Sequence, residues 1–289
     1  MKPVPQGEQG MILITVLLFV ALAAGVVALM LSGEDAALGR AQRMRDAAAA
    51  QAAVRGAEAS AIVALRRDAV LAPNADYAGE AWGALSERGA RIEGGTFDLA
   101  IADAQGRFNI NALGGDGLDA SLLAIRVARA LNLPQDMAIR ATDMLRRMGP
   151  VTDLSPLRLF GLPPETMAAL AQLATALPGD APVNVNAASE QLLAILLDNP
   201  EAAAKLVAVR TRQGFLTPDD FQKAGVMLPP GTGFKSDLFW VRTRVTIGDT
   251  PQQLTSLLQR RRVPGGVEVV AIGRWRGAAV PEQAPALAF

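Results

Sequence analysis

The chain has 289 residues and contains no cysteine and no histidine. It therefore cannot form a disulfide framework, a thiolate or imidazole zinc site, a Ser-His-Asp triad or a Cys-His pair. The lack of cysteine does not identify the redox compartment, although it is compatible with an oxidising one. Catalysis by carboxylates, lysine or serine stays open, but no nucleophile–base pairing can be read from the sequence. We expect a protein that is not an enzyme.

Net charge is missing as well, because 28 lysines and arginines balance 28 aspartates and glutamates. Such a chain has no overall field that would attract nucleic acid or anionic lipid. Hydrophobic residues, by contrast, make up 51% of the sequence. That content is enough for a membrane helix and one or two folded domains.

The N-terminal segment carries no charge between Glu8 and Glu34. A helix over Met11–Leu31 would be about 31 Å long, enough to cross the hydrocarbon core of a bilayer. The polar leader, residues 1–10, ends in Gly10 before the apolar run, whereas a secretory signal has its cleavage site after that run. This order resembles a type IV prepilin-like signal, in which the leader is removed and the helix stays. An uncleaved signal anchor is the alternative.

The charges that flank this helix do not determine its orientation. Arg40, Arg43 and Arg45 follow the helix closely, and Lys2 precedes it. By the positive-inside rule, this distribution does not favour an outward-facing C-terminal domain. We therefore take the orientation from the prepilin-like layout, which places that domain in the periplasm.

Residues 36–68 predict that the helix continues beyond the membrane. This stretch has no proline, and its apolar residues recur at helical spacing, forming one stripe: Val54, Ala61, Ile62 and Leu65. The pair Pro73-Asn74 predicts its end. We expect the stripe to pack on a sheet. A free coiled-coil stalk is less favoured, because the stripe is short and lacks repeated heptads.

Alternating residues predict a sheet. Strands over 90–93 and 96–103 are separated by Gly94-Gly95, a two-residue hairpin turn, and Phe97, Leu99 and Ile101 share the buried face. Two further strands are predicted far downstream, over 238–247 and 266–272. Residues 118–228 between them have an almost wholly helical pattern, so we expect a helical domain inserted into an α/β domain.

The inserted segment has an internal repeat of a helix, a proline-bearing turn and a second helix. The first unit has helices over 154–160 and 166–176, and the second over 187–197 and 202–211. Ser155 and Asn199 are predicted N-caps. Glu165 and Glu201 follow prolines in first helical turns, where carboxylates suit the helix dipole.

Four features occur in the order found in one known family. They are the glycine-terminated leader, the G-R-F-N-x-N motif, an S-x-L-R-L-like helix start and a P-V-N-V-N-x-A-S segment. The chain thus resembles the GspK-type minor pseudopilins of type II secretion systems over nearly its whole length. The motif residues that carry the resemblance are Gly106, Arg107, Phe108, Asn109, Asn111, Leu157, Arg158, Leu159, Asn184 and Asn186.

The resemblance implies a pilin-like α+β fold, with a long N-terminal transmembrane helix packed on a small antiparallel sheet and a large all-α domain inserted into it. The implied divisions are a leader over 1–10, a transmembrane helix over 11–33, a pilin-like domain over 34–117 and 236–289, and an inserted domain with two helix-hairpin repeats over 118–235.

The resemblance also implies a role at the tip of the secretion pseudopilus, where the protein would help to initiate or cap the fibre. The implied partners are the I- and J-type minor pseudopilins, the other pseudopilins, the inner-membrane secretion platform and a prepilin peptidase. The peptidase would cut after Gly10, and Met11 would become N-methylated. Thr15 occupies position five of the mature chain, where most pilin-like subunits have glutamate and K-type subunits do not. The expected location is the bacterial inner membrane, with a single span.

One feature of the family is missing. Many K-type subunits have an aspartate-rich stretch before the S-x-L-R-L-like helix, associated with bound calcium. Here residues 141–153 offer only Asp143 and Asp153, whereas calcium takes six to eight oxygen ligands. We therefore expect no cofactor and no metal site. Three other aspartates are expected to be turn residues: Asp103, Asp116 and Asp119.

A rival interpretation starts from residues 183–217, which also resemble the helix-hairpin-helix units of competence-type DNA-binding proteins. Those units present backbone amides of a glycine-rich turn to a DNA phosphate. The corresponding turn here, residues 198–201, has no glycine, one proline and two carboxylates. Such a turn would repel a phosphate, so we expect no nucleic-acid partner.

Overall fold

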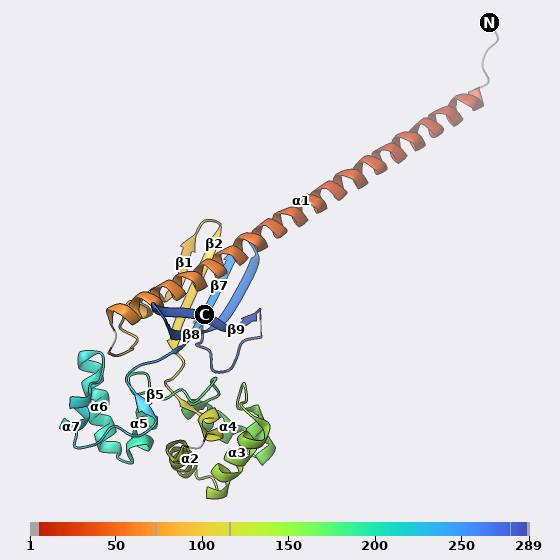
Figure 1. Cartoon of the computed structure of the whole chain (residues 1–289). Coiled ribbons are helices and arrows are strands. Elements are labelled where there is room, and N and C mark those ends of the chain that lie inside the picture. Colours follow the sequence, from red (N-terminus) through yellow and green to blue (C-terminus); the bar gives the residue numbers. More distant parts are fainter. Residues whose placement is uncertain (1–5, 73, 116, 278, 288–289) are drawn as a thin grey trace.

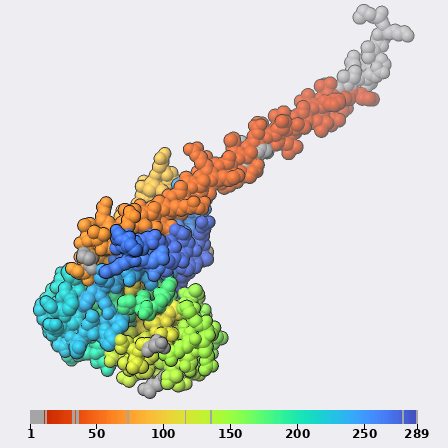
Figure 2. All heavy atoms as spheres, viewed as in Figure 1, coloured from red at the N-terminus to blue at the C-terminus, as the bar shows by residue number. Residues whose placement is uncertain are grey.

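A single helix runs through the first quarter of the chain. The computed structural model describes residues 6–72, 74–115, 117–277 and 279–287. Helix α1 spans Gln6–Leu71, 66 residues. Its N-terminal half projects as a rod from the folded remainder of the chain (Figures 1 and 2). Its C-terminal half lies along a sheet, and the two together are called the head. The predicted continuity of the membrane helix with the helix that follows it is confirmed.

The sheet of the head has five strands in the order β1-β2-β7-β8-β9, and every neighbouring pair is antiparallel. The strands are β1 (Glu87–Ile92), β2 (Gly95–Asp103), β7 (Leu238–Ile247), β8 (Thr250–Val263) and β9 (Gly266–Arg276). Strands β2 and β7, adjacent in the sheet, are separated in sequence by the whole helical insertion.

Helix α1 covers one face of this sheet. The predicted stripe is there: Val54, Ala61 and Leu65 are buried, and Ile62 is partly buried. Sheet residues that meet this part of α1 include Leu99, Ile101, Phe239, Val241 and Leu258. Trp82, just before the 3-10 helix η1 (Gly83–Leu85), closes this core. Because the stripe is covered by the sheet, the coiled-coil alternative is wrong for this part of α1.

The hairpin between β1 and β2 differs from the prediction by one residue. Ile92 pairs with Gly95, so the turn residues are Glu93 and Gly94, not Gly94 and Gly95. Gly94 takes the left-handed conformation, with φ of 73°. Gly95 belongs to the strand, where a Cβ atom would lie 1.7 Å from the backbone oxygen of Thr246 on β7. Both glycines are therefore needed, the first by the turn and the second by close strand contact.

Strand β8 was not predicted from the sequence. It lies between β7 and β9 and has a buried middle, from Leu254 to Leu258. Glutamines and arginines on both sides of that middle obscure the alternation of apolar and polar residues: Gln252, Gln253, Gln259, Arg260, Arg261 and Arg262. A strand that begins and ends in polar residues gives little period-2 pattern for a sequence-based assignment.

The helices of the insertion lie at the end of the head farthest from the free half of α1 (Figure 1). They are α2 (Leu118–Ala130), α3 (Gln135–Met148), α4 (Pro164–Leu173), α5 (Glu190–Leu197), α6 (Pro200–Gln213) and α7 (Pro218–Lys223), with the 3-10 helices η2 (Ile110–Gly114) and η3 (Ser155–Phe160). One continuous hydrophobic core, with Leu123, Leu145 and Leu157 at one end and Leu206 and Phe221 at the other, joins them.

Short parallel bridges close two units within the insertion. β3 (Phe108–Asn109) pairs with β4 (Ala174–Thr175) and closes the unit that contains α2 to α4. β5 (Val183–Asn184) pairs with β6 (Thr232–Gly233) and closes the unit that contains α5 to α7. The insertion is thus helical apart from these two-residue strands, and the predicted α+β fold with a helical insertion is confirmed.

The predicted repeat is only partly regular. Its second unit has the expected Asn199 cap, whose side chain accepts a hydrogen bond from Ala202 N. In the first unit, the predicted helix over 154–160 is a 3-10 helix, and Ser155 is its first residue and not its N-cap. Asp153 takes the capping role instead, because its Oδ1 accepts from Ser155 N at 2.7 Å. Glu165 and Glu201 do lie in the first turns of α4 and α6.

Candidate functional site

The free half of α1 has the length and composition of a membrane-spanning helix. Residues Leu13–Leu31 have a mean hydropathy of 2.8, and none of this segment is buried within the chain. A segment of this length and apolarity is energetically suited to a bilayer core and unsuited to water. A single-pass anchor at the N-terminus therefore fits the described part of the chain.

The predicted processing junction lies inside this helix. Gly10 and Met11 are both helical residues of α1, which begins at Gln6. The hydroxyl of Thr15 donates to the carbonyl oxygen of Met11 at 2.8 Å. The side chain at position five of the expected mature chain is thus satisfied by its own helix and offers no charge to a neighbour.

The asparagines of the G-R-F-N-x-N motif hold loops of the insertion together. The Oδ1 of Asn109 accepts from Leu177 N and from Asn111 N, and its Nδ2 donates to Gly179 O. Asn111 Nδ2 donates to Val151 O and to Leu177 O, and its Oδ1 accepts from Val151 N. Both side chains are buried, so their roles are internal.

Asn184 and Asn186 of the P-V-N-V-N segment bond across the junction between the insertion and the head. Asn184 Nδ2 lies 2.7 Å from Asp103 Oδ2, 2.9 Å from Asp76 O and 3.0 Å from Ser236 Oγ. Asn186 Oδ1 accepts from Leu216 N, and its Nδ2 donates to Phe234 O. Asn184 has no exposed surface. This segment therefore ties α1's following loop, the end of β2 and the start of β7 to the insertion.

The other motif residues divide between core and surface. A Cβ atom at Gly106 would lie 2.7 Å from Ala187 O, so glycine allows close contact with the P-V-N-V-N-x-A-S segment. Phe108 and Leu157 belong to the core of the insertion. Arg107 is partly buried, and burial lowers the pKa of its guanidinium. Two residues are exposed: Arg158 and Leu159.

The described aspartates that were considered as calcium ligands or turn residues lie on different elements. Asp143 is exposed on α3, Asp153 caps η3 and Asp119 is in the first turn of α2. Asp116 lies outside the described residues. Asp103, predicted as a turn residue, is the last residue of β2, and its Oδ1 accepts from Gln105 N at 2.7 Å in the turn that follows. Burial nevertheless raises the pKa of Asp103 to about 6, against hydrogen bonds from Ser236, Gln105 and Asn184 that lower it.

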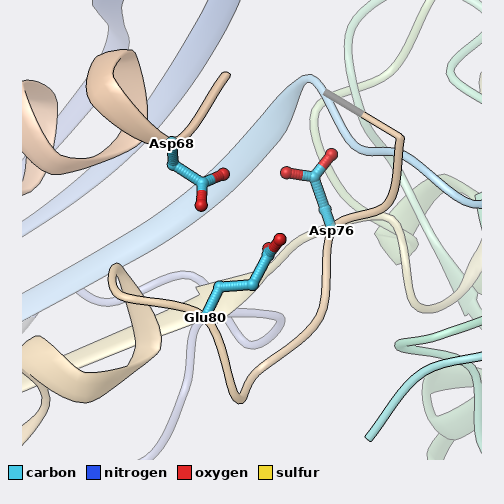
Figure 3. A group of neighbouring side chains, drawn as sticks. All are labelled: Asp68, Asp76 and Glu80. Atoms are coloured by element: carbon cyan, nitrogen blue, oxygen red, sulfur yellow. The ribbon is translucent and has the colours of Figure 1, made fainter. Parts of the chain in front are cut away.

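A second acidic group was missed by the sequence analysis. Asp68 at the end of α1 and Asp76 and Glu80 in the next loop point toward one another (Figure 3), and all three are buried. Arg260 of β8 bridges two of them, at 2.9 Å from Asp68 and 2.7 Å from Asp76. No spacing in the sequence could indicate this group, because its arginine follows Asp76 by 184 residues.

Glu80 is the member of this group that Arg260 does not contact. Its Oε2 accepts from Tyr77 N at 3.0 Å and from Trp82 Nε1 at 2.8 Å, and its Oε1 has no hydrogen-bond partner in the described part of the chain. Burial raises the pKa of Glu80 to about 7; the two hydrogen bonds lower it, and Asp68 and Asp76 raise it further. Burial likewise raises the pKa of Asp68, against the effect of Arg260.

The turn between α5 and α6 lacks the glycine-rich sequence of a phosphate-binding hairpin. Asp198 takes the left-handed conformation, with φ of 52°, at the end of α5. Pro200 begins α6 and offers no backbone N–H, and the side chains of Asp198 and Glu201 are exposed. The turn therefore presents carboxylates where a DNA-binding hairpin presents amides.

A cleft of about 1000 Å³ lies on the sheet face opposite α1. Its walls include Trp240 and Trp275 of the sheet, whose rings are 5.5 Å apart, and Met167 of α4. Residues 279–283 of the C-terminal segment line it as well. The cleft separates the sheet from the first unit of the insertion.

Together, the apolar half-helix, the helix-on-sheet head and the helical insertion form the pilin-like fold predicted from the sequence, with an N-terminal helix that fits a membrane anchor. The family model of type II secretion system (T2SS), protein K, matches residues 183–239, from β5 into β7. The type II secretion system protein K of Pseudomonas aeruginosa is 29% identical over 309 residues, covering 92% of each chain. That of Pectobacterium carotovorum subsp. carotovorum is 25% identical, covering 87% of this chain and 92% of its own.

A solved structure has the same fold. A chain of the GspK-GspI-GspJ complex from the type 2 secretion system of enterotoxigenic Escherichia coli matches with a TM-score of 0.59 and 18% identity. The match covers 83% of this chain and 100% of that chain. The similarity to type II secretion system protein K, predicted from the sequence motifs, is therefore confirmed.

Proposed function

We propose that this chain is the K-type minor pseudopilin of a type II secretion system, and that it occupies the tip of the pseudopilus. There it helps to initiate or cap the fibre that exports proteins across the outer membrane. The observation that carries the proposal is the similarity to protein K over 92% of this chain in one relative and 87% in another.

The membrane helix supports this role. In a pilin-like fibre, a glutamate at position five is thought to balance the amino-terminal charge of the subunit ahead. Burying that amine without a partner would be unfavourable by several kcal/mol. Thr15 offers only a hydroxyl, which already bonds Met11 O. A chain with Thr15 is poorly suited to follow another subunit, whereas a tip subunit has none ahead of it.

The position of the insertion supports it as well. Helices α2 to α7 lie at the end of the head remote from the membrane anchor (Figure 1). In a fibre of parallel helices, the subunit ahead of this one would lie at that end. A domain of this size there would obstruct a subunit placed above, which suits a subunit that ends the fibre.

We propose the I- and J-type minor pseudopilins as direct partners, since the structural relative was solved in a complex with GspI and GspJ. A prepilin peptidase, the other pseudopilins and the inner-membrane platform complete the set. In this role the C-terminal domain lies in the periplasm and the protein carries out no catalysis. The DNA-binding alternative has less support, given the acidic turn at residues 198–201.

Light scattering of the full-length chain in detergent, mixed with its full-length I- and J-type partners, tests this proposal. We expect a single species with one copy of each protein. An unrelated single-span protein of similar size, substituted for either partner, is the control and should give no ternary species. Long homopolymers of this chain, or no association with either partner at high micromolar concentration, would contradict the proposal.

A further inference from the structure

Three buried carboxyl groups, Asp68, Asp76 and Glu80, face one shared space at the junction of α1, its following loop and the sheet (Figure 3). One oxygen from each lies within 4.8 Å of the others. We propose that this space is a binding site for a hard divalent cation such as Ca²⁺, which prefers carboxylate oxygens.

The charge balance within the group favours a cation. Three carboxylates face one guanidinium, that of Arg260, so the ionised group has two negative charges in excess. Uncompensated charge of this kind is strongly unfavourable in a buried position, and one divalent cation would neutralise it.

Glu80 supplies a second and independent observation. The residue is 7% exposed, yet Oε1 has no hydrogen-bond partner among the described residues. The Oε2 atom is fixed by Tyr77 N and Trp82 Nε1, which orient the carboxyl group. The carboxyl group of Glu80, which carries the free oxygen, points toward those of Asp68 and Asp76 (Figure 3). Buried acceptors are almost always satisfied, so an oriented orphan oxygen indicates a missing ligand.

Arg260 leaves room for this ligand. Its guanidinium donates hydrogen bonds to Asp68 Oδ2 and Asp76 Oδ1, and Asp76 Oδ2 accepts from Ser236 N at 2.8 Å. Among the described residues, no hydrogen bond or ion pair joins the guanidinium to Glu80. The cation would be held by Glu80 Oε1 and Asp68, with Asp76 and backbone or water oxygens completing the shell. It would fasten the end of α1 to the loop that Asn184 joins to the insertion.

Divalent-ion content per chain tests the site. The full-length protein in detergent is dialysed against Ca²⁺, and separately Mg²⁺, at about 1 mM, the range of extracellular calcium sites. We expect one ion per chain and a higher thermal midpoint with the ion than with chelator. Glu80→Gln keeps an acceptor for Tyr77 and Trp82 and should weaken binding about tenfold or more. Circular dichroism checks that the variant is folded.

The double variant Asp143→Asn/Asp153→Asn is the control, because it removes exposed carboxylates of the insertion and leaves the buried group unchanged. It should bind the ion as the wild-type chain does. A folded wild-type protein that retains no divalent ion would overturn the proposal. Unchanged ion binding by the Glu80→Gln variant would also overturn it, and so would loss of ion binding in the control variant. If Glu80→Gln does not fold, Asp68→Asn gives the same comparison.

Discussion

At Gly95, the close approach of two strands leaves no space for a side chain. A methyl group there would lie 1.7 Å from Thr246 O, which neither backbone can accommodate without moving. We expect Gly95→Ala to lower the free energy of unfolding by about 3 kcal/mol, by overpacking within two paired strands. Gly56→Ala is the matched control, since nothing lies within 4 Å of its Cβ position in α1. That variant should gain about 0.5–1 kcal/mol from helix propensity. Denaturant unfolding of the two variants, monitored by tryptophan fluorescence, checks both values, and equal stabilities would contradict the assignment.

Asp103 should make stability depend on pH. Burial raises its pKa from 3.8 to about 6 in the folded chain, so the folded state holds a proton that the unfolded state loses at lower pH. The stabilising contribution is full below the unfolded value and is lost as pH rises through about 6. The whole effect is at most roughly 3 kcal/mol. Asp103→Asn should remove this slope while keeping the acceptor for Gln105 N. Unfolding measured at about pH 4 and about pH 8 compares the two chains, and parallel pH profiles would refute the prediction.

The junction of Gly10 and Met11 stays a prediction from the sequence. A prepilin peptidase needs a small residue before the cut, so Gly10→Val should leave the full precursor in the membrane. The wild-type chain should begin at a methylated Met11 in cells with active peptidase. Gly25→Val is the control, because it changes another glycine of α1 with open space around its Cβ position, and it should be processed. Intact mass separates the three proteins. A wild-type chain that keeps residues 1–10 would show that the segment is an uncleaved anchor.

Among the elements, those with one apolar face or a complete alternation could be predicted from the sequence. The stripe on α1 and the strand Leu238–Ile247 are examples, the second with the same bounds in the structure. Strand β8 could not be predicted, because its polar ends hide the buried middle. The 3-10 form of η3 was missed too, since propensity does not distinguish a short helix that Asp153 and Gly161 confine to six residues.

The turn between α5 and α6 gives a prediction at this scale. Its exposed Asp198 and Glu201 should repel DNA phosphate, and Pro200 lacks one amide donor. We expect no appreciable binding of duplex DNA by the full-length chain in detergent. Fluorescence anisotropy at low salt is the most sensitive trial, because phosphate contacts are strongest there. Micromolar binding that weakens with added salt would favour the competence-type alternative.

At the scale of the molecule, the junction between head and insertion depends on residues far apart in the chain. Asn184 meets Asp76 and Ser236, and Arg260 meets Asp68. The sequence identified Asn184 through its family motif but gave no reason for its position. The acidic group could not be predicted at all, since no local spacing joins α1 to β8. Only the complete fold brings these groups together and shows that the motif asparagines are buried and bond within the chain.

The tip position is the last prediction, and it concerns the whole molecule. The insertion caps the head at the end remote from the anchor (Figure 1), and Thr15 provides no carboxylate for a subunit ahead. Both features favour entry as the first subunit of a fibre and disfavour any later position. Gold-labelled antibody against the insertion should therefore mark one end of each fibre, with labelling per fibre independent of fibre length. Antibody against the most abundant subunit is the control and should decorate the whole shaft. Label distributed along the shaft would place this chain within the fibre, where its insertion would have to move aside for each subunit above it.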